Sequence, residues 1–381
     1  MDAKARLNYI KWDPKFLTEK PYHLYMDPPP GLPVSNYEIV PGPVETIHDL
    51  RKYMHGSSNS NSDDSNTRHH NSNNNPNPNL ENNFPNLDDN GFILVHQPFS
   101  FPPAPLTEDF IQRTYLPSLE ALIRTIPGIA TTTTKPTPSE SPPPSSSSSS
   151  SSNENKPDSD SDLKDQQQDQ DQEIQIHWFD HRTRSSNPET RTSKLPIGSK
   201  FYLDDRTISL APVKTVHVDQ SPTSAISRIH TLLGPEKASR LLKTKRVRLL
   251  NIWRPYGESP VENHPLALCD GSSVAEGDLV AADAVRKSYV GEAYYLVAPP
   301  PDAGDADAGT GTGGYRWFYV SRQRREEVLV FKMFDSDSSV KAGCVPHVSF
   351  EDLNLGDGEG GGSGKPPRES IEARALVFSP L

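Results

Sequence analysis

Four long polar tracts limit how much of this 381-residue chain can enter a folded core. They are rich in Asn/Ser, Ser/Pro/Gln/Asp, Ala/Asp/Gly/Thr and Gly, and occupy residues 56–89, 131–172, 302–314 and 356–366. Such tracts bury too little apolar surface to offset the conformational entropy that ordering would cost. We therefore expect disordered inserts of roughly 100 residues in all, within one domain that spans 1–381 and draws its core from the remainder.

The inserts also account for the acidic character of the chain. The formal net charge is −11, and by formal count the four tracts carry all of it. The remainder is close to neutral and has no basic run or stripe, so we expect no nucleic-acid partner.

Membrane insertion and secretion are not expected either. The sequence has no apolar run of 18 residues, which a membrane-spanning helix needs. The first residues lack the apolar centre of a signal peptide. Cys269 and Cys344 could form one bridge, but two cysteines are more typical of reduced thiols. We expect a cytoplasmic protein.

Short strands dominate the sequence after the second tract. Alternating or β-branched apolar residues predict about eight strands between residues 173 and 381. The candidates are 173–179, 212–218, 247–253, 277–285, 291–298, 315–321, 327–334 and 370–378. Their number and spacing favour a mainly β fold, a jelly roll or double-stranded β-helix, over alternating β-α units.

Helices and extended segments should flank this core. Residues 107–125 predict a helix that Thr107 caps and Pro117 kinks. Residues 223–246 predict a basic helical region. The Tyr- and Pro-rich segment 8–55 suits an extended wrapping segment better than loops. Two further elements are expected, a buried strand at 91–97 and a hairpin that joins 315–321 to 327–334.

His217-Val218-Asp219 is the sharpest local motif. In a strand, residues two apart point to the same face, so an imidazole and a carboxylate would lie side by side. Fe(II) accepts this pair, and a second histidine from another strand would complete a facial set of three ligands. His347 is that candidate, because it follows a strand far along the chain.

Arg368-Glu369-Ser370 opens the last predicted strand. Arginine offers a bidentate fork to a carboxylate, and the Ser370 hydroxyl can add a hydrogen bond to the same oxygens. In a jelly roll with an H-x-D…H iron site, such a pair typically anchors a carboxylate cosubstrate, here 2-oxoglutarate. The order H-x-D, His, R-x-S is more specific than any of its parts.

The sequence resembles the fungal AsaB-type hydroxylase/desaturase family, whose relatives include gibberellin desaturases and the CmcJ-type cephem methoxylase component. The resemblance rests on residues 251–255, 265–270, 316–319, 327–332, 346–347 and 368–378, and it covers most of the chain outside the inserts. It implies oxidative tailoring of small molecules in secondary metabolism. The four inserts depart from the family pattern.

Other polar residues allow alternative roles. Arg254 could replace Arg368 as the carboxylate clamp, although packing beside a tryptophan is the commoner role. Arg374 alternates in phase with Ser370 and could point the same way, but a salt bridge to Glu372 or another acid is favoured. His177 and His181 should share a strand face, where a structural or substrate-contact role is favoured over a second metal site.

These residues together predict an Fe(II)/2-oxoglutarate-dependent hydroxylase or desaturase that oxidises a C–H bond of a small metabolite. His217, Asp219 and His347 would bind the metal, and Arg368 and Ser370, or Arg254, the cosubstrate. Two alternatives stay open, namely a non-catalytic jelly-roll binding or accessory subunit, and a zinc-dependent hydrolase or isomerase with the same ligands. An accessory protein is a possible partner.

Overall fold

The computed structural model describes residues 1–54, 84–130, 173–187, 206, 208–300, 314–355 and 365–381. Its strands form two sheets, as the sequence predicts for a jelly roll. The nine-stranded sheet runs β1 (Ala3–Ile10), β3 (Ile39–Asp49), β11 (Trp317–Tyr319), β8 (Leu266–Cys269), β13 (His347–Ser349), β6 (His217–Val218), β10 (Val290–Leu296), β9 (Leu279–Val285), β2 (Tyr22–Leu24). The five-stranded sheet runs β4 (Phe92–His96), β12 (Glu327–Asp335), β7 (Lys245–Pro255), β14 (Glu369–Pro380), β5 (Gln175–Ser185).

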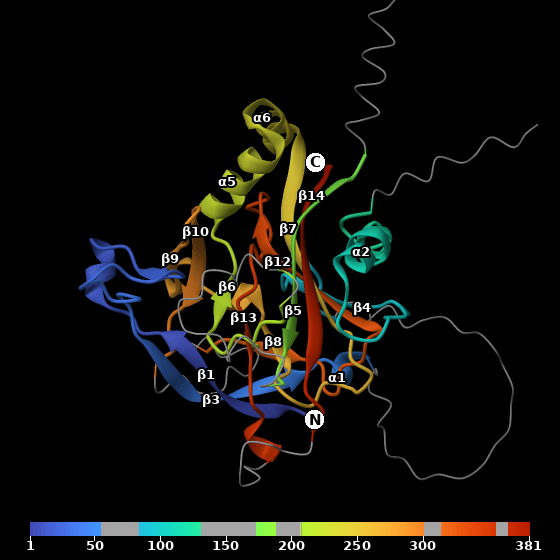
Figure 1. Ribbon diagram of the computed structural model, residues 1–381, viewed down its shortest axis with the longest axis horizontal. Helices are drawn as coiled ribbons and strands as arrows, with labels where there is room; N and C mark the ends of the chain where they lie inside the picture. Colours follow the sequence, from blue (N-terminus) through green and yellow to red (C-terminus); the bar gives the residue numbers. More distant parts are fainter. Residues whose placement is uncertain (55–83, 131–172, 188–205, 207, 301–313, 356–364) are drawn as a thin grey trace, which may run out of the picture.

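The helices lie on the outside of the two sheets (Figure 1). They are α1 (Arg51–Met54), α2 (Glu108–Phe110), a π-helical turn (Ile111–Tyr115), α3 (Leu116–Ile123), α5 (Pro222–Leu233), α6 (Pro235–Thr244) and four short 3₁₀ turns (Pro14–Leu17, Gly271–Ser273, Glu276–Asp278, Leu353–Leu355). No helix in the described part of the chain is long and apolar enough to span a membrane. Both cysteines are free thiols.

The apolar core lies between the sheets and behind the smaller one. Leu268 and Phe318 of the nine-stranded sheet pack with Trp253 and Phe331 of the five-stranded sheet. On the outer face of the five-stranded sheet, α3 packs its apolar stripe against residues of β7, β12 and β14. Strands β7 and β14 are buried along almost their whole length, and each carries charged side chains among its apolar ones.

The two predicted helical regions form with local interruptions. The side chain of Thr107 accepts a hydrogen bond from the amide of Phe110, which confirms the predicted cap. Pro117 lies in the first turn of α3, directly after the π-helical turn, where its missing N–H is tolerated. The second region is two helices, because Gly234 adopts a φ of 77° and Pro235 starts α6.

The predicted hairpin of 315–321 and 327–334 is wrong. Strand β11 pairs with β3 and β8 in the nine-stranded sheet, whereas β12 pairs with β4 and β7 in the other. The polar link between them therefore crosses from one sheet to the other. The early segment also differs from the prediction, because β1 and β3 pair as regular sheet strands instead of only wrapping the core.

The first predicted insert ends sooner than expected. Residues 84–89 are described; Leu87 is buried, and the carboxylate of Asp88 lies 2.6 Å from Nη2 of Arg246. The end of this tract thus contributes a carboxylate to an arginine of β7. Residues 131–172, 302–313 and 356–364 of the other inserts lie outside the described residues.

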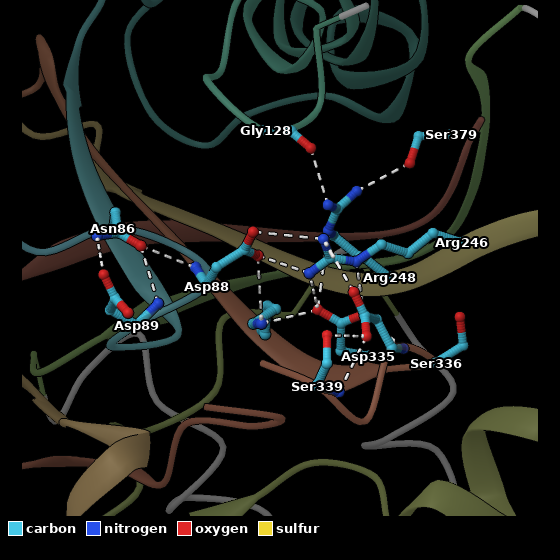
Figure 2. Close-up of polar contacts among 12 residues, drawn as sticks. Asn86, Asp88, Asp89, Gly128, Arg246, Arg248, Asp335, Ser336, Ser339 and Ser379 are labelled. Atoms are coloured by element: carbon cyan, nitrogen blue, oxygen red, sulfur yellow. Dashed lines mark hydrogen bonds and ion pairs between the residues drawn. The ribbon is translucent and has the colours of Figure 1, made fainter. Parts of the chain in front are cut away.

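Arg246 belongs to an ion network whose centre is Asp335 (Figure 2). Its fully buried carboxylate contacts Arg246 and Nζ of Lys332 at 2.7 Å each, and Nε of Arg248 at 3.8 Å. Burial raises the pKa of Asp335, but Arg246 and Lys332 outweigh that effect and the pKa lies below its usual value. The network fastens β12 to β7 and to Asp88.

We predict that Asp335→Asn destabilises the protein by about 3 kcal/mol or more, because it leaves buried cations without their counter-charge. Asp337→Asn is the matched control, since Asp337 is partly exposed and lies 3.6 Å from the same Arg246. Its cost should be much smaller than that of Asp335→Asn, because solvent screens an exposed ion pair. Urea unfolding at pH 7 measures both changes, and equal losses would contradict this account of the network.

Candidate metal centre

Two neighbouring strands of the nine-stranded sheet bring the predicted histidines together. His217 on β6 pairs directly with His347 on β13 in antiparallel register. The centroids of their rings are 4.4 Å apart. Opposite residues of an antiparallel pair point to the same face. The two histidines are therefore neighbours in the sheet although they are 130 residues apart in the sequence.

Asp219 completes the cluster. It follows β6 directly, and its carboxylate lies 3.6 Å from Nε2 of His217 and 3.7 Å from Nε2 of His347. The candidate ligand atoms of the three residues all lie within 4.8 Å of one another, and no other such group occurs among the described residues. The three residues that the sequence singled out therefore meet at one point.

The backbone fixes how both imidazoles present themselves. Nδ1 of His217 lies 2.9 Å from the carbonyl oxygen of Thr215, and Nδ1 of His347 lies 3.1 Å from that of Val345. A carbonyl only accepts, so Nδ1 carries the proton of each neutral ring. Nε2 is left with its lone pair and points toward Asp219, which is the arrangement that a metal ion requires.

Arg374 holds the carboxylate from the opposite sheet. Its Nε lies 3.1 Å from Oδ2 of Asp219 and its Nη2 lies 3.2 Å from Oδ1. Burial raises the pKa of Asp219, but Arg374 and both histidines outweigh this, and the pKa lies well below its usual value. Burial lowers the pKa of His347 to about 4. A carboxylate and a neutral imidazole at pH 7 are the forms that bind a metal.

Further acids surround Arg374, as the sequence predicted. Its Nη1 lies 2.6 Å from Asp180 on β5, and its Nη2 lies 2.7 Å from Glu372 on its own strand. A third partner, which was not predicted from the sequence, is the candidate metal ligand Asp219.

Asn251 was overlooked in the sequence. Its Nδ2 lies 3.3 Å from Oδ2 of Asp219, and its Oδ1 is buried with no hydrogen-bond partner among the described residues. The available signal was a buried amide in the apolar run 247–253, in phase with Trp253.

Arg368 lies beside this centre. Its Nη1 lies 2.6 Å from the carbonyl oxygen of His264 and 3.0 Å from Oγ of Ser349. Ser349 shares a face of β13 with His347, two residues and about 7 Å away. The guanidinium also lies over Trp253, 5.5 Å from the ring centroid.

The donor groups near Arg368 are suited to a ligand carboxylate. Nε of Arg368 and Oγ of Ser370 are both buried and have no hydrogen-bond partner among the described residues. Burial lowers the pKa of Arg368 to about 9, so it remains a cation at pH 7. A buried, incompletely paired cation next to a free hydroxyl is costly unless an anion binds there.

The structure does not bring Arg254 to this place. Arg254 pairs across the sheet with Ile371, whose side chain belongs to the outer core, and not with a residue of the inner face. Its guanidinium lies near Phe99 and Phe101 and donates to the carbonyl oxygen of Gln97. Arg254 therefore lies on the opposite face of β7 from Asn251, and it cannot serve the predicted clamp role there.

His177 and His181 do not share a strand face. A bulge at Phe179 shifts the register, so that Asp180 pairs with Arg374 but Trp178 pairs with Ala375. His181 is buried and lies 3.0 Å from Glu108. The expectation that i and i+4 coincide is wrong here, because the bulge adds a residue between them.

Two imidazoles and one carboxylate inside a jelly roll form the donor set of mononuclear non-heme iron sites. A family model described as "Oxidoreductase/YMDC permease-like domain" matches residues 161–378, more than half of the chain. The chain belongs to this family.

Curated relatives are fungal proteins. Over 214 residues the chain is 33% identical to "Hydroxylase/desaturase CTB9" of Cercospora beticola. This alignment covers 54% of this chain and 58% of the relative. Over 170 residues it is 35% identical to "Fe(II)/2-oxoglutarate-dependent dioxygenase nvfI" of Aspergillus novofumigatus, which covers 44% and 52%. The chain thus matches a little over half of the length of these relatives.

The fold is that of a solved oxygenase. The structure of "iron and alpha-ketoglutarate-dependent endoperoxidase NvfI" aligns over 100% of this chain and 99% of its own, with a TM-score of 0.60 and 20% identity. A variant of the same protein aligns with a TM-score of 0.63 and 22% identity. This likeness establishes the jelly-roll architecture.

We predict that Arg374→Gln destabilises the metal-free protein at pH 7 by about 3 kcal/mol or more, because Asp219, Glu372 and Asp180 lose their shared cation. Asp219 and Glu372 have lowered pKa values in the folded protein. Their stabilising contribution is therefore present above the unfolded pKa values and is lost as the pH falls below them.

The difference in the free energy of unfolding between the variant and the original protein should therefore become smaller as the pH falls from 5 to 3. Urea unfolding across that range measures it. Arg113 is exposed, and among the described residues its one ion pair is with Asp109, four residues earlier. It supplies the control Arg113→Gln, with an expected cost of about 0.5 kcal/mol. A difference that stays constant down to pH 3 would refute the assignment.

Proposed function

We propose that this protein is an Fe(II)/2-oxoglutarate-dependent oxygenase that hydroxylates or desaturates a small molecule. The observation that carries the proposal is the convergence of His217, Asp219 and His347 within 4.8 Å, with both Nε2 lone pairs directed at one carboxylate. The names of the curated relatives, which include hydroxylase/desaturase and Fe(II)/2-oxoglutarate-dependent dioxygenase, support the same class.

In this proposal the three side chains bind iron(II) on one face. Nε2 of each histidine and one oxygen of Asp219 are the ligand atoms. Arg374 and Asn251 hold Asp219, since both donate to Oδ2. Orienting contacts of this kind fix ligand geometry and typically contribute tenfold or more to metal affinity.

The cosubstrate 2-oxoglutarate binds with its distal carboxylate at Arg368 and Ser370. The fork of Arg368 is held in place by the carbonyl oxygen of His264 and by Ser349, which leaves Nε and the Ser370 hydroxyl for the ligand. The spacing along β13 between Ser349 and His347, about 7 Å, suits a short dicarboxylate that reaches from the clamp to the metal.

Iron(II) and 2-oxoglutarate, when bound, convert dioxygen into an oxidant strong enough to remove hydrogen from an unactivated C–H bond. The protein contributes orientation and exclusion of water. Phe331 lies 4.8 Å from the ring of His347, and Trp253 covers Arg368, so both ligand groups meet apolar walls on the side of the core. Such walls strengthen the ion pairs within the site.

Finer assignments belong to this proposal as well. We propose that the chain is an AsaB-type hydroxylase/desaturase, with gibberellin desaturases and the CmcJ-type component among its relatives, and that it forms one domain in the cytoplasm. Two free thiols agree with a reducing compartment. The substrate is a small molecule, and an accessory protein could assist the reaction.

The first test is metal binding. His217→Ala, His347→Ala and Asp219→Ala should each lower the iron(II) content of anaerobically prepared protein at least tenfold and abolish formation of succinate and carbon dioxide from 2-oxoglutarate. His177→Ala, a histidine outside the cluster, is the control and should retain both properties. Stoichiometric zinc without any carbon dioxide release would instead identify a hydrolytic site.

The second test concerns the cosubstrate. Arg368→Met should weaken 2-oxoglutarate binding by roughly 30-fold or more, because a buried charge-assisted pair contributes about 2–5 kcal/mol. Arg254→Met removes a buried arginine of the other sheet face and should leave that affinity unchanged. Calorimetric titration with the metal present gives both values. The clamp assignment fails when the two variants respond alike.

A further inference from the structure

Arginines outnumber acids beside the candidate metal centre. Among the described residues, three carboxylates form ion pairs with Arg374, namely Asp180, Asp219 and Glu372. Six arginines act on these acids or on one another through their charges: Arg182, Arg184, Arg206, Arg228, Arg286 and Arg374. We call these six the arginine cluster. A bound metal cation would increase the positive excess further.

The three acids are already engaged. Asp180 lies 2.6 Å from Arg374 and 3.2 Å from Arg206. Glu372 lies 2.9 Å from Arg184 and 2.7 Å from Arg374. Arg182 also lies 3.7 Å from Asp180. The described residues therefore offer Arg228 and Arg286 little negative charge.

Arg286 is the clearest case. Among the described residues it has no carboxylate within ion-pair distance, and its Nε is buried without a hydrogen-bond partner. Its guanidinium lies over the rings of Tyr25 and Tyr289, 5.1 and 5.2 Å from their centroids. Two rings thus hold the cation in place while its hydrogen-bonding groups are not paired with an acid.

Arg228 has a similar setting on α5. Its guanidinium lies 4.7 Å from the ring centroid of Phe179. Its Nε and Nη2 lie 2.6 and 3.1 Å from the neutral side-chain amide of Gln220, whose oxygen accepts from both once the amide is turned toward them. Arg286 and Arg374 both lie close enough to disfavour its charge.

Tyrosines connect Arg286 to the metal ligands. Tyr295 on β10 pairs directly with His217 on β6. Burial is the largest effect on the pKa of Tyr25 and raises it. Tyr295 and Asp219 raise this pKa further, while Arg286 lowers it. The charges of Asp219, a candidate metal ligand, and of Arg286 therefore both act on Tyr25. Tyr37 extends this aromatic group, 5.2 Å from the ring of Tyr295.

We propose that Arg286 and Arg228 bind an acidic group of the substrate, so that the enzyme acts on a carboxylic acid whose apolar body lies against Tyr25 and Tyr295 beside the metal. That the bound acid is a substrate rests on the proposed function. The binding of an acid by Arg286 and Arg228 does not depend on it. Guanidinium groups bind carboxylates in a fork geometry, and tyrosine rings provide the apolar contact area.

The carboxylate of 2-oxoglutarate is the other acid that could occupy these arginines. The two sources differ in position, because the cosubstrate clamp is Arg368 with Ser370, at the start of β14, whereas Arg286 lies at the end of β9. A test with 2-oxoglutarate at saturation separates them.

The experiment titrates the full-length protein, loaded with Mn(II) and saturating 2-oxoglutarate without oxygen, with acids and their matched amides. The pairs are 3-phenylpropanoate with 3-phenylpropanamide, and decanoate with decanamide, and calorimetry gives the dissociation constants. At least one acid should bind about tenfold or more tightly than its amide, as a charge-assisted pair predicts. Arg286→Gln and Arg228→Gln should each remove most of this preference, and Arg286→Lys should restore part of it.

Controls separate this effect from misfolding and from the proposed function. Arg113→Gln removes an exposed guanidinium elsewhere and should keep the preference. Thermal unfolding must show that Arg286→Gln is folded, and its 2-oxoglutarate affinity should match that of the original protein. If iron binding and 2-oxoglutarate turnover fail but the acid preference persists, the proposed function is wrong and the acid site stands.

Three results would overturn the inference. Acids and amides could bind equally, or not at all, in every pair. The preference could survive the double variant Arg228→Gln/Arg286→Gln. It could also disappear in Arg368→Gln alone, which would assign the acid to the cosubstrate position.

Discussion

The ion pair between Arg374 and Asp219 joins the two sheets at the point where the candidate metal ligands meet. Arg374 comes from the middle of β14, in the five-stranded sheet, and Asp219 follows β6, in the nine-stranded sheet. The strand β6 has only two residues, so few backbone bonds fix its end. The guanidinium adds a restraint on this end and keeps the carboxylate of Asp219 ionised next to the two histidines.

Much of this arrangement could be predicted because it depends on local periodicity. The spacing of His217 and Asp219 on one strand end requires only the alternation of side chains. The long strands β7 and β14 were also predicted, because β-branched and other apolar residues recur along both. Pairing between strands that are distant in sequence is a different matter, because the residues of one strand do not specify its neighbour. The supposed hairpin failed for this reason.

Arg254 and the two histidines of β5 illustrate a second limit. A shift of one residue in register, or one bulge, sends a side chain to the other face of a sheet. The bulge at Phe179 and the pairing of Arg254 with Ile371 are set by the whole sheet. Local sequence gives the period of a strand but not its phase relative to the core.

The parallel pairing of β2 with β9 brings Tyr22–Leu24, and with it the adjacent Tyr25, to the neighbourhood of β10 and the metal ligands. A segment from the first thirty residues thereby furnishes one wall of a centre whose ligands all come from beyond residue 200. Selection can alter that wall without touching the ligand-bearing strands. A substitution near Tyr25 would therefore change the surroundings of the candidate metal centre without changing a strand that carries one of its ligands.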